Sequence, residues 1–155
     1  MNSGALGEMK VIEVCQVMAG PFCGCLLADM GADVIKVENP EGGDTARDMG
    51  RYFDGGEGHG FMNLNRNKRS IVVNLKEESG IKLLKELIKK SDIFIENLRP
   101  GTIDKMGLGY NDLKKINDSI IYASISGYGK TGPFSGKGGF DLVSQGLSSL
   151  MSFTG

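Results

Sequence analysis

The sequence is poor in the residues from which metal sites, redox sites and disulfide frameworks are built. Its 155 residues include three cysteines and one histidine, His59. The cysteines, Cys15, Cys23 and Cys25, are odd in number, and the last two are one residue too close for a C-x-x-C motif. A single imidazole leaves out most zinc sites and Ser-His-Asp arrangements. We therefore expect no metal site, and we interpret the three thiols as structural.

The sequence also lacks membrane signals and a strong charge of either sign. No apolar run approaches the ~18 residues of a transmembrane helix, and residues 1–5 have neither the basic nor the apolar region of a signal peptide. The 18 basic and 19 acidic residues give a formal net charge of -1, which argues against a nucleic acid or an anionic membrane as the main partner. We expect a cytoplasmic protein.

Glycine, by contrast, is abundant. The chain has 24 glycines, a share roughly twice the usual ~7%, with clusters at residues 55–60 and 127–139. Such loops are either mobile or bring the backbone close to a ligand. The sequence does not separate these two interpretations.

The apolar pattern predicts alternating strands and helices. Short runs rich in β-branched residues predict strands at Lys10–Val14, Asp33–Glu38, Ser70–Asn74, Ile93–Glu96 and Ile120–Ser126. Helices are predicted at Phe22–Met30, along the apolar face of Ile81, Leu84, Leu87 and Ile88, at Tyr110–Ile116 and from Asp141 onward. Asn39–Gly60 has turn residues and no clear period, which predicts a long surface loop.

This alternation predicts an α/β fold, a Rossmann-like, mostly parallel, doubly wound sheet whose ligands sit at the carboxyl ends of the strands. Glu38 ends the second strand, where a dinucleotide fold has its ribose-binding acid. The first turn, however, contains no G-x-G-x-x-G, and Pro21 removes an N–H that would hold a pyrophosphate. The sequence therefore argues against a nicotinamide dinucleotide.

Several blocks together carry a family resemblance. They are Lys10–Val14, Met18–Pro21, Leu27–Glu38, Gly43–Asp44, Asn63–Val73, Asp92–Gly101, Met106–Tyr110, Ser124–Gly132, Gly139–Gly146 and Thr154–Gly155. In register, they resemble the opening of the class III CoA-transferases, also called CaiB/BaiF, which include formyl-CoA and carnitine CoA-transferases and alpha-methylacyl-CoA racemase. The resemblance covers nearly the whole chain.

The resemblance implies a fold, an assembly and a reaction. Family members are more than twice this long, with a Rossmann-like large domain and a smaller second domain, and two chains interlock as a homodimer. A nucleophilic Asp accepts the acyl group of an acyl-CoA, becomes an aspartyl-CoA thioester, and passes CoA to a free carboxylic acid. That Asp follows the block matching 140–155, so we expect residues 1–155 to be the N-terminal, CoA-binding part of the large domain, without the nucleophile.

The resemblance also implies site residues. Gln16 and Asp141 are candidates for supporting the chemistry. The positions expected to contact coenzyme A are Met18, Ala19, Asn39, Val73, Asn74, Leu75, Lys76, Asn97, Leu98, Arg99, Lys105, Gly139 and Phe140.

Four of these positions depart from the family pattern. Gln16 stands where formyl-CoA transferase has His, and Asn39 stands where an Arg stacks on adenine. Lys105 replaces an Arg, so it can meet a phosphate as a point charge but not bidentately. Phe140 replaces the catalytic His of the racemases, which speaks for a transferase and against a racemase.

Simpler interpretations stay open for individual residues. Lys76 and Lys105 could be solvated charges, Asn97 could cap the turn before Pro100, and Asp141 could be a helix N-cap. The basic run of Arg66, Lys68 and Arg69 could contact CoA phosphates or form a solvated or dimer face.

Two other functions also stay open. One is an acyl-CoA racemase, which abstracts a proton at the α-carbon. The other is a non-catalytic chain that binds CoA or assembles with a partner chain.

Overall fold

A five-stranded parallel sheet forms the centre of the computed structural model, which describes residues 4–50 and 58–155. The strands are β1 (Lys10–Val14), β2 (Asp33–Glu38), β3 (Arg69–Val72), β4 (Ile93–Glu96) and β5 (Ile121–Ser124). They lie in the order β3-β2-β1-β4-β5, and all four pairings are parallel. The expected Rossmann-like α/β sheet is confirmed.

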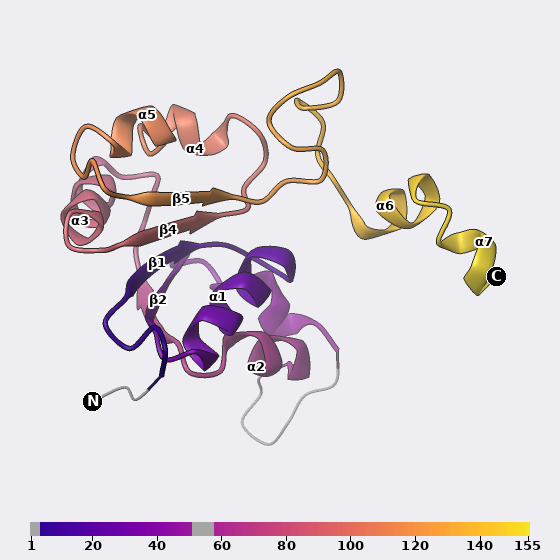
Figure 1. Ribbon diagram of the computed structural model, residues 1–155, viewed down its shortest axis with the longest axis horizontal. Coiled ribbons are helices and arrows are strands. Elements are labelled where there is room, and N and C mark those ends of the chain that lie inside the picture. The colour runs from indigo at the N-terminus through magenta and orange to yellow at the C-terminus, as the bar shows by residue number, and fades with distance from the viewer. Residues whose placement is uncertain (1–3, 51–57) are drawn as a thin grey trace.

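Helices cover both faces of this sheet (Figure 1). In chain order the helices of the described residues are α1 (Ala19–Asp29), the 3-10 helix η1 (Thr45–Asp48), α2 (His59–Asn65), α3 (Glu78–Ile88), α4 (Thr102–Lys105), α5 (Tyr110–Leu113), α6 (Asp141–Leu147) and α7 (Met151–Thr154), of which α6 and α7 lie away from the sheet (Figure 1). Among the described residues, no helix is long and apolar enough to span a membrane.

Alternate strand residues divide the core into two clusters. On one face Ile12 and Phe94 pack with Leu84 and Ile88 of α3 and with the side chains of α4 and α5. On the other face the buried strand residues, such as Val34, pack beneath α1. Because both faces are covered, the strands are apolar on both sides, which is why they appear in the sequence as continuous runs.

The structure corrects the predicted loop over Asn39–Gly60. It contains η1 and the start of α2, and three of its described residues, Asp44, Ala46 and Gly58, are buried. Hydrogen bonds to the Asp44 carboxylate, rather than an apolar face, hold this segment in place. Its sequence therefore shows no apolar period from which a helix could be predicted. Residues 51–57 of the predicted loop lie outside the described residues.

Two helix predictions also need correction, and one further helix was missed. Helix α1 begins at Ala19 rather than Phe22, and α4, directly after Gly101, was not predicted. The helix predicted from Asp141 onward is two short helices, because Ser149 between them adopts a left-handed conformation (φ 62°). Helices of four to seven residues are too short to show a clear amphipathic period.

Helices α6 and α7 extend away from the sheet (Figure 1), and their apolar side chains are exposed. Leu142 is 69% exposed, Leu147 66% and Phe153 86%. Contiguous exposed apolar surface of this kind is typical of contact surfaces.

We predict that a polypeptide of residues 1–155 self-associates through this segment. Replacing Leu142 and Leu147 together by Gln should lower its weight-average mass in sedimentation velocity, because the substitutions remove exposed apolar area. Leu83→Gln is the matched control, since Leu83 is equally apolar and about half exposed on α3. A monodisperse monomer of the unaltered polypeptide would contradict the prediction.

Candidate functional site

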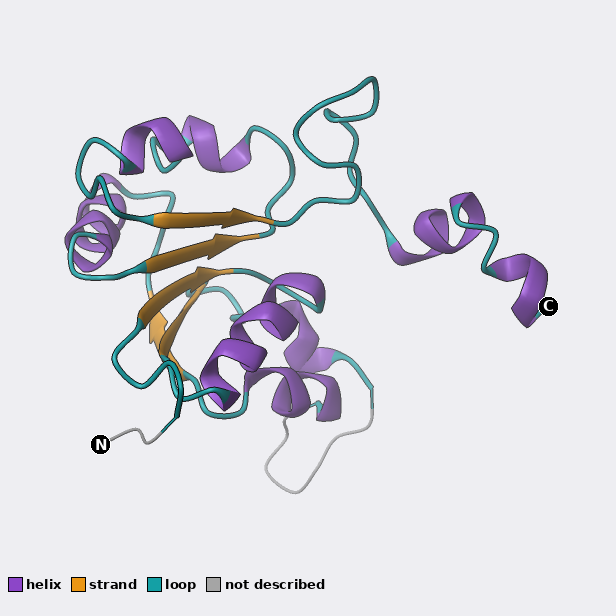
Figure 2. Cartoon of the chain, viewed as in Figure 1, coloured by secondary structure: helices purple, strands orange, loops and turns teal. Residues whose placement is uncertain are grey.

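The loops that follow the strands meet at the carboxyl edge of the sheet (Figure 2). A cavity of about 160 Å³, here called the strand-end cavity, lies among the exits of β1, β2 and β3. It is lined by Val14, Cys15, Gln16, Val37, Glu38, Asn39, Val73, Asn74, Leu75, Lys76, Leu98 and Met106. This is where an open α/β sheet places its ligand.

Seven of the sequence-predicted site residues line the strand-end cavity. They are Gln16, Asn39, Val73, Asn74, Leu75, Lys76 and Leu98. They come from four separate strand exits, so the fold brings together residues that the sequence separates by up to 82 positions.

Two asparagines shape the rim of this cavity through local turns. The Asn39 Oδ1 accepts a hydrogen bond from the Glu41 N–H at 3.0 Å, and the Asn74 Oδ1 accepts one from the Lys76 N–H at 3.0 Å. The Lys76 ammonium lies 3.5 Å from the Glu41 carboxylate, with both side chains largely exposed. An exposed pair of this kind is weak, so Lys76 can turn toward an anion at little cost.

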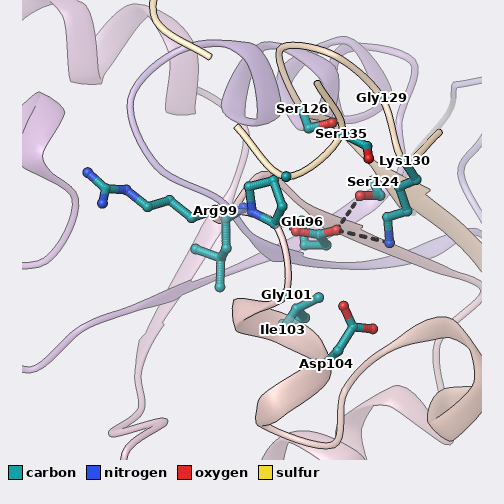
Figure 3. A pocket seen from close by; sticks show the side chains of 13 residues that line it. Glu96, Arg99, Gly101, Ile103, Asp104, Ser124, Ser126, Gly129, Lys130 and Ser135 are labelled. Carbon is teal, nitrogen blue, oxygen red and sulfur yellow. Dashed lines mark hydrogen bonds and ion pairs between the residues drawn. The ribbon is translucent and has the colours of Figure 1, made fainter. Parts of the chain in front are cut away.

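A second cavity of about 230 Å³, the glycine-loop cavity, lies between the β4–α4 connection and the loop after β5 (Figure 3). At its floor Glu96 is buried and accepts hydrogen bonds from the Leu98 N–H at 3.1 Å and from the Ser124 hydroxyl. The Lys130 Nζ lies 3.7 Å from Glu96 Oε1. Arg99 also lines this cavity, but its guanidinium points away from Glu96. Leu98 lines both cavities, which are therefore neighbours.

The other predicted site residues line neither cavity. They are Met18, Ala19, Asn97, Lys105, Gly139, Phe140 and Asp141. Met18 and Phe140 are both 62% exposed, and residues 139–141 lead into α6, away from the sheet (Figure 1).

Two of the simpler interpretations are wrong. The Asn97 side chain does not cap the turn before Pro100: it accepts from the Gln16 N–H at 2.9 Å and donates to the Gln16 carbonyl at 2.8 Å, which ties β4 to the exit of β1. Asp141 is not an N-cap, because α6 begins at Asp141 and the preceding Phe140 is its N-cap. The Asp141 carboxylate instead accepts a hydrogen bond from the side-chain amide of Gln145.

The basic run is paired within the chain. Arg66 pairs with Asp29, and Arg69 pairs with Asp33 at 2.6 Å. Lys68 is buried and lies 2.7 Å from Glu13. These partners account for all three charges without a phosphate.

Sequence reasoning missed the charged residues inside the sheet. The buried Lys36 ammonium lies 3.1 Å from Glu13 and 2.8 Å from Asp44, and it donates to the Cys15 carbonyl at 2.9 Å. Burial alone would lower the pKa of Lys36, but Glu13 and Asp44 outweigh it and leave the pKa above its ordinary value. The sequence signal that could have revealed these pairs is a charged residue inside a buried, otherwise apolar strand. Because a charged side chain is rarely buried unless it is paired, such a residue indicates a buried ion pair.

Cys15 lines the strand-end cavity, but it is not an activated thiol. Burial, together with the negative charge of Glu13, raises the pKa of Cys15 far above its ordinary value. Burial also raises the pKa of Cys23 and Cys25. Since the thiolate is the nucleophile, these values agree with the structural interpretation of the thiols.

Fold and site define an α/β protein with a Rossmann-like sheet and a ligand site at its carboxyl edge. Residues 6–155 match the family model described as "CoA-transferase family III". The chain belongs to this family.

Similar proteins agree with the match. Human (Homo sapiens) "Succinyl-CoA:glutarate CoA-transferase" is 47% identical over 99% of this chain and 35% of its own length. "Acetyl-CoA:oxalate CoA-transferase" of Acetobacter aceti is 41% identical over 98% of this chain and 39% of its own. The crystal structure of a CAIB/BAIF family protein from Brucella suis, 42% identical, matches with a TM-score of 0.90 over 96% of this chain and 40% of that one. The chain thus spans 35–40% of the length of these proteins.

We predict that Glu38 makes stability depend on acid pH. Burial raises its pKa, but hydrogen bonds from Arg47, Ser70 and the Asp44 N–H outweigh burial and lower the pKa from 4.5 to about 2. A carboxyl with a lowered pKa stabilises the fold fully above its unfolded pKa, and this contribution is lost as the pH falls from about 4.5 toward 2. Glu38→Gln should therefore cost on the order of 2 kcal/mol at pH 7.

The measurement is urea unfolding of the wild type and the variant between pH 7 and pH 2.5, as far as both stay folded. The difference between their unfolding free energies should shrink as the pH falls. Glu86→Gln, which changes an exposed carboxylate paired with Lys89 on α3, is the control and should leave the pH dependence close to that of the wild type. A difference for Glu38→Gln that stays constant with pH would contradict the prediction.

Proposed function

We propose that the complete protein transfers CoA between an acyl-CoA and a free carboxylic acid, and that this chain supplies its CoA-binding part. The observation that carries the proposal is the family match over residues 6–155. Two of the similar proteins named above are CoA-transferases by name, and six predicted CoA-contact residues line one cavity together with Gln16.

The reaction proceeds through carboxylate and thiolate nucleophiles. A carboxylate of the protein attacks the acyl-CoA carbonyl, the thiolate of CoA leaves, and a mixed anhydride forms. The thiolate then attacks the protein's carboxyl carbon, which gives an aspartyl-CoA thioester and releases the donor acid. The acceptor carboxylate attacks this thioester, the thiolate of CoA leaves, and a second mixed anhydride forms. The thiolate then attacks the acceptor's carbonyl carbon, which gives the new acyl-CoA and frees the protein's carboxylate. Each step exchanges one acyl bond for another, so no step needs an oxidant or a reductant.

The residues divide the bound CoA between them. Lys76 and Lys105 meet its phosphates, and Asn39 lies beside the nucleotide. Met18 and Ala19, at the start of α1, approach the pantetheine and the thiol. Gly139 and Phe140 flank the acyl group.

The remaining predicted residues line the path of CoA or support the chemistry. The exits of β3 and β4 contribute contact residues to the path, which are Val73, Asn74, Leu75, Asn97, Leu98 and Arg99. Gln16 and Asp141 support the chemistry. We expect the nucleophilic Asp after the segment that matches residues 140–155, within the remainder of the complete protein.

The proposed assembly is an interlocked homodimer in the cytoplasm. The apolar side chains exposed on α6 and α7 are the kind of surface that a second copy covers. This surface supports the proposal because an obligate dimer interface is more hydrophobic than the rest of the protein surface.

We predict that Lys76→Ala weakens the binding of CoA by about tenfold, because a charge-assisted hydrogen bond to phosphate contributes roughly 1.5 kcal/mol or more. Isothermal titration of the full chain with CoA measures the effect. Lys82→Ala is the matched control, since Lys82 is an exposed lysine on α3 that lines neither cavity. Equal affinities for the wild type and Lys76→Ala would remove Lys76 from the site.

The transfer itself is tested on the complete protein with a panel of acyl-CoA donors and carboxylic acids, by following the formation of the new acyl-CoA. Exchange with at least one pair is expected. Incorporation of deuterium at the α-carbon from D₂O, without any transfer of CoA, would instead identify a racemase. Binding of CoA with neither reaction would identify a non-catalytic chain.

A further inference from the structure

Val17, between β1 and α1, has an unusual backbone conformation. Its φ is 67°, in the left-handed region that β-branched residues rarely adopt, because the branched side chain crowds the backbone there. A strained residue of this kind persists only where its surroundings hold it. The question is what holds Val17.

The Asp44 carboxylate is the group in contact with it. Asp44 Oδ1 accepts a hydrogen bond from the Val17 N–H at 2.9 Å and a second from the Ala46 N–H at 2.9 Å. Asp44 is 1% exposed, and its Oδ2 lies 2.8 Å from the Lys36 Nζ. The carboxylate thus reaches across 27 residues of sequence to fix one peptide group of the β1–α1 loop.

Lys36 fixes the same loop at a second point. Its ammonium has three protons and three acceptors nearby: Asp44, Glu13 and the Cys15 carbonyl, the last at 2.9 Å. Lys36 donates hydrogen bonds to Glu13 and to the Cys15 carbonyl, and it forms an ion pair with Asp44. Cys15 and Val17 are held from the same side by one connected set of charges.

The arrangement is costly as a source of stability alone. A buried ion pair gains little over well-packed apolar residues, because its charges lose their hydration. The ion pair does fix the path of the chain, because its hydrogen bonds join defined atoms, whereas apolar contacts would let the backbone shift. The residue so directed is followed immediately by Met18 and by Ala19 at the start of α1.

We propose that Asp44 is a positioning residue which, with Lys36, holds Val17 in its left-handed conformation and so fixes the β1–α1 loop at the thioester end of CoA. The position of CoA rests on the function proposed above. The hold on Val17 rests on the contacts alone. A purely structural alternative is that Asp44 serves only as the N-cap of η1, through the Ala46 N–H.

Glycine at position 17 separates the two alternatives, because glycine adopts a positive φ without strain. If Asp44 acts through Val17, Asp44→Ala should lower kcat/KM for CoA transfer by about 100-fold, in the range that small misplacements of reacting groups cost. Adding Val17→Gly to Asp44→Ala should restore at least about tenfold of this loss. If Asp44 is only a cap, the glycine restores nothing.

The matched control is Ser149→Gly. Ser149 has nearly the same φ, 62°, but it lies between α6 and α7. Combined with Asp44→Ala, it should restore no activity. Equal rescue by both glycines would overturn the proposal.

A second readout does not depend on the reaction. Amide hydrogen exchange of the segment 15–19 should become at least about tenfold faster in Asp44→Ala, because the Val17 N–H loses its acceptor and fixed backbone hydrogen bonds set this rate. Unchanged exchange in Asp44→Ala overturns the hold on Val17. If the wild type transfers no CoA to any acid, the proposed function fails, while the exchange rates still decide whether Asp44 positions the loop.

A further variant covers the case in which Asp44→Ala fails to fold because Lys36 loses a partner. Val17→Pro fixes a negative φ and removes the N–H, while it leaves Lys36, Asp44 and Glu13 in place. It should lose activity and exchange protection to the same extent as expected for Asp44→Ala. Wild-type exchange and activity in Val17→Pro would overturn the proposal.

Discussion

The carboxyl edge of the sheet depends on the pairing of one buried ammonium group, that of Lys36. The side chain is 1% exposed and lies between Glu13 of β1 and Asp44 of the β2–η1 segment. Removing one partner from such a set leaves an uncompensated buried charge, at a cost of about 3–5 kcal/mol. The exit of β1, strand β2 and the segment after it therefore keep one another in place.

Two further side chains, Lys68 and Asn97, hold the β1–α1 loop and the start of α1. Lys68 shares Glu13 with Lys36 and donates to the Pro21 carbonyl at 2.7 Å in α1. Asn97 ties Gln16 to the exit of β4. Side chains from three other parts of the chain thus fix the β1–α1 loop and the first turn of α1. The loop after β5, beside the glycine-loop cavity, is held differently. It is rich in glycine, and its Lys130 forms an ion pair with the buried Glu96.

The sheet could be predicted from the sequence because its strands are buried on both faces. β-branched apolar runs gave the ends of β1, β2 and β4 as the structure has them. The seven predicted residues of one cavity came from the family resemblance, not from the apolar pattern. The short helices α2 and α4 could not be predicted, since they have no period to detect. The pairing of Lys36 with Asp44 could not be predicted either, because the partner of a charge is set by the folded path of the chain.

The size of the strand-end cavity bears on how the proposed ligand would lie. At about 160 Å³ it is smaller than the roughly 300–1,000 Å³ of typical small-molecule sites, so it would receive one part of CoA and leave the rest on the protein surface. Met18 and Phe140, which line neither cavity, are strongly exposed apolar side chains. Exposed apolar groups gain free energy when a ligand or another part of the protein covers them. A site completed by further protein surface would explain both the small cavity and the exposure of Met18 and Phe140, which we expect to contact CoA, whereas a site confined to the cavity would explain neither.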